Sequence, residues 1–319
     1  MIKIRMQSAG GIIEIDKPCA GCWIDARNVD KSDLQRLEQD YGIAAELLAD
    51  IMDIDEQSRI EQDENYIAII VGMPVWDTSN EIACFTVPLG IILFHDKIVT
   101  VCQRSGDALH DIAANRVKGV SLRSQSAFVL NILSRAAYTF LRALKELNRN
   151  SNEIENVLQK SVRNNELIQL LKLQKSLVYF TTSIKSNGLL LEKMQKQTFL
   201  RLQEEEIELL EDVITDNVQS MEMANIYSSI LTGTMDAFAS VISNNLNIVM
   251  KRLAIVNIVL MIPTLIYSFY GMNVHLPFQE NVLAVIGIAA FSLFASLAGV
   301  VLLNIDSTFK NRIRLKGKK

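Results

Sequence analysis

The stretch that decides the fold is residues 244–304, NNLNIVMKRLAIVNIVLMIPTLIYSFYGMNVHLPFQENVLAVIGIAAFSLFASLAGVVLLN. No Lys, Arg, Asp or Glu lies between Arg252 and Glu280, and none lies between Glu280 and Asp306. Each run is longer than the roughly 20 apolar residues that cross a hydrocarbon core about 30 Å thick. The sequence therefore predicts two membrane-spanning helices near the C-terminus.

Basic residues flank these two predicted helices on one side. Lys251 and Arg252 lie at the start of the first helix, 252–273, and six Lys or Arg residues lie in the tail, 305–319, behind the second helix, 282–304. The connecting loop, 274–281, holds no Lys or Arg. Because cytoplasmic flanks collect Lys and Arg, we expect both termini in the cytoplasm and the loop outside. This topology predicts a multi-pass protein of the cell inner or plasma membrane.

The residues ahead of the membrane segment predict a cytoplasmic α+β domain over 1–188, a mixed sheet flanked by helices. Short β-prone runs with Gly or Pro between them predict strands. These runs are 2–6, 12–15, 22–26, 66–73, 82–87, 90–94 and 98–102. Asp30 and Asp33 offer cap chemistry for a helix that Gly42 interrupts, and a second helix follows it.

From residue 105 the hydrophobic period becomes helical, which predicts a long helical hairpin. The polar residues 148–152 predict a surface stretch or turn, and Ser186-Asn187-Gly188 predicts a helix end. Behind Gly188 the sequence predicts a stalk, 189–251, that is helical from about Glu205 and continues into the first membrane helix. Such a helix spans roughly 100 Å at 1.5 Å per residue, so we expect several copies to bury it in a bundle.

Composition excludes several classes of function. The chain has 319 residues, 49% of them hydrophobic, and a formal net charge of −4. No basic stripe with interleaved aromatic residues is present, so nucleic acid is not an expected partner. Neither a phosphate-binding Gly-x-x-x-x-Gly-Lys loop nor the spacing of a catalytic triad occurs, so we do not expect an enzyme. The first residues, MIKIRMQSAGG, lack the apolar region of a signal peptide.

Two further motifs have a plain interpretation. Cys19 and Cys22 form a CxxC, which is typical of half a zinc site or of a redox pair. Cys84 and Cys102 are too far apart to complete a zinc site, and Cys22 opens a predicted strand rather than a helix, so we interpret all four as ordinary reduced cysteines. The acid-rich stretch 52–64 lacks the ligand spacing and central Gly of a calcium loop and is expected to be a solvated connection.

The first membrane helix carries a stripe of polar, small and thioether side chains at steps of three or four. Its members are Asn247, Met250, Leu253, Asn257, Met261, Thr264, Ser268 and Gly271. A polar stripe in a membrane helix either holds helices together or lines a water-filled path. One chain with two helices cannot enclose a path, so the second interpretation requires several copies around an axis.

The sequence at the outer end of that helix favours the second interpretation, in which the stripe lines a water-filled path. Tyr270-Gly271-Met272-Asn273 closes the helix, in a two-helix C-terminal hairpin with basic flanks. In this position the motif resembles the CorA family of magnesium channels. In the related ZntB branch, associated with zinc, the residue at the position of Met272 is usually not Met, so the resemblance favours magnesium.

The resemblance implies a homopentamer and a role for each part of the stripe. Gly271, Met272 and Asn273 would form the selectivity filter. The stripe from Asn247 to Ser268 would line the pore, and Met250 and Leu253 would form its hydrophobic gate. Asp236 would add a ring of carboxylates at the cytoplasmic mouth. Mg²⁺ would be both the substrate and a regulatory ligand.

Acids cluster on the predicted stalk, at Glu204-Glu205-Glu206, Glu208, Glu211, Asp212 and Asp216. Like charges four residues apart weaken a helix, and a divalent cation between neighbouring subunits would relieve the repulsion. The resemblance implies that Mg²⁺ bound here keeps the channel closed. Asp212 matches such a ligand, its companion lies near Asp77 or Glu81, and Asp216 stands where some relatives have histidine.

Two alternatives remain open at this point. The first is a ZntB-like transporter of zinc or another divalent metal, including one that works in the direction of efflux. The second, of a different class, is a membrane-anchored sensor or scaffold that uses the stalk as a coiled coil and conducts nothing.

Overall fold

The structure is a computed structural model that describes residues 1–76, 84–117, 119–160, 164–196, 202–272, 283 and 286–301. The chain divides into two compact units, Met1–Asp236 and Ala237–Lys319. The first unit holds the sheet and most of the helices, and the second holds the apolar C-terminal segment.

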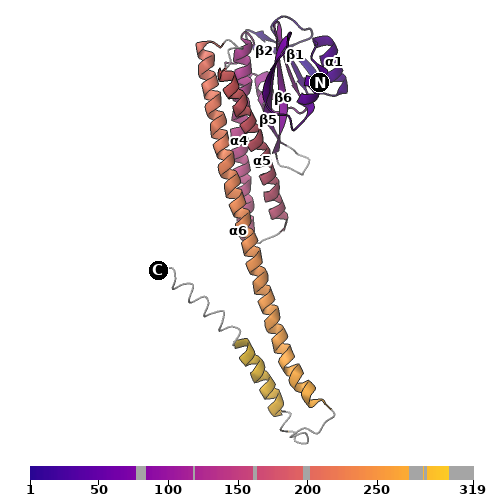
Figure 1. The fold of residues 1–319 in the computed structure, drawn as a ribbon, viewed down its shortest axis with the longest axis vertical. Helices are drawn as coiled ribbons and strands as arrows, with labels where there is room; N and C mark the ends of the chain where they lie inside the picture. The colour runs from indigo at the N-terminus through magenta and orange to yellow at the C-terminus, as the bar shows by residue number, and fades with distance from the viewer. Residues whose placement is uncertain are drawn as a thin grey trace. The chain divides into compact units, whose positions relative to one another are not determined.

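The first unit is built around a seven-stranded mixed sheet, as expected (Figure 1). The strand order is β2-β1-β3-β7-β6-β5-β4, and all neighbours pair antiparallel except β3 and β7, which pair parallel. The strands are β1 Ile2–Ser8, β2 Gly11–Ile15, β3 Cys22–Arg27, β4 Arg59–Gln62, β5 Tyr66–Trp76, β6 Cys84–Phe94 and β7 Lys97–Cys102.

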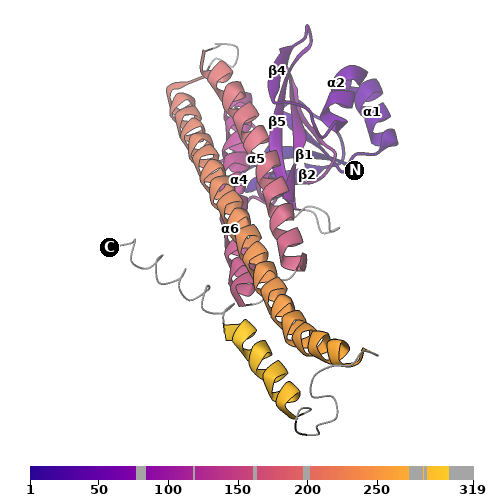
Figure 2. The same ribbon diagram turned by 60° about the horizontal axis from the view of Figure 1, so that its bottom comes forward.

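Helices cover both faces of this sheet (Figure 2). The helices are α1 Lys31–Tyr41, α2 Ala45–Met52, α3 Asp107–Ala113, α4 Gln125–Lys160, α5 Asn164–Lys196 and α6 Glu204–Tyr270. Successive strand residues point to opposite faces: Ile70 packs in the core beneath α1 and α2, whereas Ile69 packs in the core beneath α3, α4 and α5. Every residue of β6 is buried, which explains its continuous apolar sequence.

The two short helices begin and end as the sequence predicts. Asp30 accepts a hydrogen bond from the Asp33 N–H at 2.8 Å and forms a capping box with that residue. Gly42 ends α1 in the left-handed region at φ +69°, a conformation that glycine adopts without steric cost.

One strand is continuous where two were predicted, because Pro88 does not interrupt β6. Proline has no N–H to donate to a sheet ladder. The pairing of β6 with β7 begins at Leu89, opposite Cys102, so Pro88 lies just beyond it. On its other side Pro88 lies opposite Gly72, whose N–H and C=O bond to the Asn187 side chain. The proline therefore occupies a place where no ladder bond is lost.

The prediction that 52–64 is only a solvated connection is wrong for β4. Arg59–Gln62 pairs antiparallel with β5, and Ile60 is buried. Arg59 donates to Asp50 at 2.7 Å and to Glu56, so two of the acids near this strand are partners of one arginine. The strand is too short for its alternating pattern to be recognised among so many charges.

One predicted helix end is also wrong, because α5 continues through Ser186-Asn187-Gly188 to Lys196. Residues 148–152 form no turn and lie inside α4 as a surface stretch, where their side chains are exposed or half-buried. Asn187 is buried, donates from Nδ2 to Gly72 O at 3.0 Å and accepts from Gly72 N–H at 2.9 Å. A Cβ on Gly188 would lie 3.1 Å from Asn217 Nδ2, so the glycine allows α6 to approach closely. These residues join α5 to its neighbours instead of ending the helix.

Replacing Asn187 by alanine should destabilise the first unit. The change removes the buried partner of the Gly72 C=O and of the Ser58 hydroxyl, and it leaves the Gly72 N–H with Ser58 Oγ alone, at 3.2 Å. We expect a loss of about 2–4 kcal/mol in unfolding free energy. Thermal unfolding of the full chain in detergent, followed by circular dichroism, measures the change. Asn152→Ala, at an exposed position on α4, is the matched control. Equal melting temperatures for the two variants would contradict this role of Asn187.

Candidate functional site

The second unit contains the membrane-type helix segment. Among the described residues, α6 is the one helix with the length and composition to cross a membrane, with a mean hydropathy of 2.0 in its most apolar window. Ile286–Val301 forms a shorter apolar helix within the predicted second span. Pro263 lies inside α6 without ending it, as the sequence analysis expects for a membrane helix.

One face of α6 packs against the helix Ile286–Val301. The buried Ser296 hydroxyl donates to Ser292 O of its own helix at 2.9 Å, and its oxygen lies 3.5 Å from Val259 O of α6. Gly299 lets the two helices approach, because a Cβ at this position would lie 3.4 Å from Ile258 Cγ2 and 3.5 Å from Ile262 Cδ1. Small residues at such a crossing are typical of helix pairs in membranes. The face of α6 that packs is therefore the plain aliphatic one.

The polar stripe lies elsewhere on α6 and remains exposed. Asn247, Asn257, Thr264 and Ser268 are all exposed, and Met250, Leu253 and Met261 expose 56%, 53% and 68% of their surface. The Thr264 hydroxyl donates to Leu260 O at 2.6 Å, which leaves its oxygen lone pairs free to accept. Within the described residues of one chain, the stripe thus does not serve as the contact between the two apolar helices.

The end of α6 is set by backbone hydrogen bonds. The Gly271 N–H donates to Tyr267 O at 2.8 Å and the Met272 N–H donates to Phe269 O at 3.4 Å. Both Gly271 and Met272 are exposed. Asn273, the last residue of the predicted filter, lies outside the described residues.

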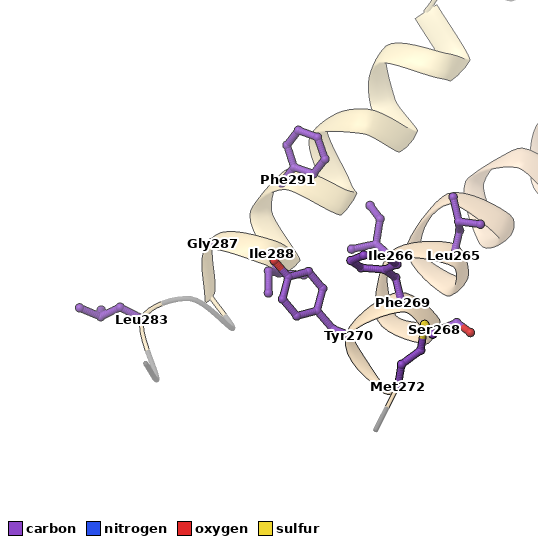
Figure 3. A pocket seen from close by; sticks show the side chains of 10 residues that line it. All are labelled: Leu265, Ile266, Ser268, Phe269, Tyr270, Met272, Leu283, Gly287, Ile288 and Phe291. Carbon is purple, nitrogen blue, oxygen red and sulfur yellow. The ribbon is translucent and has the colours of Figure 1, made fainter. Parts of the chain in front are cut away.

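Beside this end is an apolar hollow of about 900 Å³ (Figure 3). Phe269 and Tyr270 of α6 and Phe291 of the second apolar helix are among the residues that line it. The remaining residues around it are Leu265, Ile266, Ser268, Met272, Leu283, Gly287 and Ile288. An open apolar surface of this kind is costly in water, so it suits a segment that other apolar groups surround.

The predicted acid cluster on α6 divides into two groups. Glu206 is buried, and its carboxylate accepts hydrogen bonds from the hydroxyls of Ser124 at 2.6 Å and Ser126 at 2.9 Å. Its Oε2 also accepts from the Gln203 N–H at 3.0 Å. Glu206 therefore joins the start of α6 to the start of α4 and is not available to a metal ion. By sequence Glu206 belongs to the acids that would repel one another, and only the fold reveals its partners.

The other acids of the cluster face outward. Glu204, Glu205, Glu208, Glu211 and Asp212 are exposed, and Asp216 is half-buried. Asp236, the predicted mouth residue, is also exposed. Asp77 and Glu81 lie outside the described residues. In the described part of the chain no three His, Cys, Asp or Glu side chains are grouped closely enough to hold a metal ion.

The fold and the apolar C-terminal segment define a class of protein, one with an αβ unit joined through a long helix to a membrane-type segment. Residues 20–304 match the family of CorA-like Mg²⁺ transporter proteins, and the chain belongs to this family. The family consists of transporters, so the expectation that the chain is not an enzyme is confirmed.

Two relatives bear the name cobalt/magnesium transport protein CorA. The protein of Methanocaldococcus jannaschii is 27% identical over 264 residues, which cover 81% of this chain and 82% of the relative. The protein of Thermotoga maritima is 22% identical over 262 residues, which cover 79% of this chain and 72% of the relative.

Solved structures share the fold. The complete structure of the CorA magnesium transporter from Methanocaldococcus jannaschii matches with a TM-score of 0.78 and 24% identity, over 95% of this chain and 96% of that chain. The full-length CmaX protein matches with a TM-score of 0.66 and 12% identity, over 92% of this chain and 95% of that chain. The ZntB cytoplasmic domain from Vibrio parahaemolyticus matches with a TM-score of 0.57 and 11% identity, over 77% of this chain and 97% of that domain.

Removing the charge of Glu206 should destabilise the chain in a pH-dependent way. Burial alone would raise the pKa of Glu206, but the hydrogen bonds from Ser124, Gln203 and Ser126 outweigh it and hold the pKa below its ordinary value. A lowered pKa contributes stability that is present above the unfolded pKa of about 4.3 and is lost as the pH falls through the folded pKa. We expect Glu206→Gln to cost about 1–2 kcal/mol at pH 7.

Melting curves of the full chain between pH 7 and pH 3 measure this difference. The gap between the native chain and Glu206→Gln should narrow as the pH falls, because the native carboxylate itself becomes protonated. Glu205→Gln changes the same charge at the neighbouring exposed position and should have little effect. A gap that stays constant with pH would show that the charge of Glu206 is not what stabilises the chain.

Proposed function

We propose that the chain is a passive, CorA-type channel for divalent cations, chiefly Mg²⁺, with Co²⁺ and Ni²⁺ as further candidates. Membership of the CorA-like Mg²⁺ transporter family and the names of the two relatives support transport of Mg²⁺ and Co²⁺. No nucleotide-binding loop of the Gly-x-x-x-x-Gly-Lys type occurs in the sequence. We therefore infer that the membrane potential and the ion gradient drive the flow.

The observation that carries this proposal is the division of α6 into two faces. The aliphatic face around Ile258 packs against the second apolar helix, whereas the stripe that includes Asn257 is exposed. A stripe with amides and hydroxyls is costly against lipid. Several chains arranged with this face toward a common axis would hide it from lipid and surround a wet path. We propose a homopentamer.

Each part of the path would then have its own chemistry. Magnesium holds its first-shell waters tightly, so rings of Asn273 amides and Gly271 carbonyls would bind the hydrated ion through its water. Asn247, Asn257, Thr264 and Ser268 would hydrogen-bond the same water further in. Apolar rings of Met250, Leu253 and Met261 would stop ions where the path loses its water.

The proposed topology has two spans in each chain. The spans are 252–273 and 282–304, the loop 274–281 lies outside, and the N-terminal unit and the tail 305–319 lie in the cytoplasm. The Lys and Arg residues of the flanks support this orientation. Asp236 would form a carboxylate ring at the cytoplasmic mouth that concentrates cations.

Gating would come from metal bound between neighbouring cytoplasmic units. At high cytoplasmic Mg²⁺ the ion would bridge Asp212 of one chain and a carboxylate near Asp77 or Glu81 of the next, with Asp216 close by, and hold the gate closed. At low Mg²⁺ the site would empty and the gate at Met250 and Leu253 would become wet. The exposure of Asp212 supports its availability to a ligand.

Mg²⁺ uptake into proteoliposomes that contain a Mg²⁺-sensitive dye tests conduction. The native chain should admit Mg²⁺, and Asn273→Ala should abolish uptake because it removes the amide ring. Asn257→Leu should slow uptake several-fold because it replaces a polar ring with an apolar one. Ile258→Leu, the neighbouring position on the packed face, is the matched control and should leave uptake near the native rate.

Each alternative predicts a different outcome of this assay. Equal uptake by the native chain and Asn273→Ala would remove Asn273 from the mechanism. No uptake by a folded, pentameric native chain would favour a non-conducting scaffold. Zinc uptake that millimolar Mg²⁺ does not compete would favour a transporter of the ZntB kind.

Asp212→Asn should weaken closure by internal Mg²⁺. The change keeps the shape of the side chain but removes the charge that binds the ion, so the internal Mg²⁺ concentration that halves uptake should rise. Vesicles loaded with a series of Mg²⁺ concentrations measure this shift. Glu222→Gln, an exposed acid further along α6, should not move it. An unchanged midpoint for Asp212→Asn would exclude Asp212 from regulation.

A further inference from the structure

The turn between β2 and β3 holds two cysteines in a defined geometry. Cys19 and Cys22 are the first and last residues of a four-residue turn in which the Cys22 N–H donates to Cys19 O at 3.2 Å. Gly21, the third residue, has φ +77°. A positive φ at this position is the signature of a type II turn, and glycine adopts it without steric cost.

This turn brings the two cysteines within reach of each other. The first and last Cα atoms of a β-turn lie less than about 7 Å apart. A disulfide requires Cα atoms about 4.4–6.8 Å apart. By sequence the motif does not open a helix, which favours ordinary reduced cysteines. The turn provides the required proximity without a helix.

The two thiols differ in access. Cys19 is exposed, whereas Cys22 is fully buried in the core beneath α1 and α2. Burial raises the pKa of Cys22 above its ordinary value. A dissolved oxidant therefore meets Cys19 first, and Cys22 is positioned to react second.

We propose that Cys19 and Cys22 are a redox-active pair that forms a reversible intramolecular disulfide by exchange with a low-molecular-weight disulfide. The Cys19 thiolate attacks one sulfur of the disulfide RSSR, the S–S bond breaks, and RS⁻ leaves. Cys22 then loses its proton and attacks the Cys19 sulfur of the mixed disulfide, and a second RS⁻ leaves. The two cysteines are oxidised, RSSR is reduced, and the two RS⁻ groups accept protons to become 2 RSH.

A metal site is not favoured at this turn. Two thiolates are half of the four ligands that a structural zinc requires, and no third His, Cys, Asp or Glu joins them among the described residues. The disulfide closes a ring inside one turn, so its effect on stability is small. The Gly21 N–H donates to Asp96 O at 2.6 Å, so the turn is held against the loop between β6 and β7. The proposed disulfide does not rest on the proposed channel function.

Oxidised glutathione tests the pair on the full chain in detergent at pH 8. After remaining thiols are blocked with N-ethylmaleimide, mass spectrometry of the digest should find the peptide with Cys19 and Cys22 lighter by two hydrogens, and dithiothreitol should reverse the change. Cys84 and Cys102 are internal controls that should stay reduced, because burial raises the pKa of both, to about 12 for Cys102.

Two variants separate the steps. Cys22→Ala, which suits the buried position, should retain glutathione on Cys19 as a stable adduct, and Cys19→Ser at the exposed position should acquire neither adduct nor disulfide. Circular dichroism checks that both are folded. A stable glutathione adduct on Cys19 of the native chain, or a disulfide between the Cys19 residues of two chains, would overturn the proposal.

Discussion

The rest of the structure depends on the fact that, among the described residues, one chain covers only one face of the apolar part of α6. Between Ala237 and Tyr270 the helix contacts a second apolar helix through Ile258, Val259 and Ile262. The side chains of the other faces, among them Met250 and Leu253, are exposed although they are apolar. Apolar surface of this extent is stable only when lipid or further copies of the chain surround it. The exposed surface of α6 is thus the common reason for the membrane environment, for the proposed oligomer and for the proposed path between its chains.

The first unit meets the opposite requirement, because its sheet buries both faces. Alternate residues of β3, β5 and β6 enter two separate cores. The backbone groups that the sheet ladder leaves unpaired are satisfied by single side chains, of which Asn187 is the clearest. It binds both polar groups of Gly72, opposite Pro88, where β6 has no N–H to donate. A polar side chain thus permits a proline in a buried strand and a helix that passes close to the sheet.

The sequence predicted those features that depend on local chemistry or on long apolar runs. The mixed sheet, the caps of α1 at Asp30 and Gly42, and a helix from about residue 205 that passes Pro263 follow from periodicity and turn residues, and the structure contains them. The family was recognisable from the membrane segment and its final motif. These signals lie within a few neighbouring residues, so no knowledge of the fold is needed to detect them.

The errors come from residues whose partners are distant in sequence. Ser186-Asn187-Gly188 has the composition of a turn, yet its asparagine bonds to Gly72, more than a hundred residues away. β4 forms among acids because Ile60 enters the buried core that also holds Leu190 and Leu191 of α5. Glu206 belongs by sequence to an acid cluster, but two serines of α4 hold it inside the fold. Local propensity favoured the wrong interpretation in each case, and a long-range contact decided the outcome.

Without Glu206, the remaining acids of the cluster form a row along α6. Glu204, Glu208, Asp212 and Asp216 follow one another at steps of four and share one side of α6, three of them exposed and Asp216 half-buried. Like charges at this spacing oppose the helix, and no lysine or arginine occurs between Glu204 and Lys251 to offset them. Solvent and salt screen such a row while it is exposed, but they would do so less if another chain covered it. The repulsion would then be greatest at the inner members of the row, which are Glu208 and Asp212.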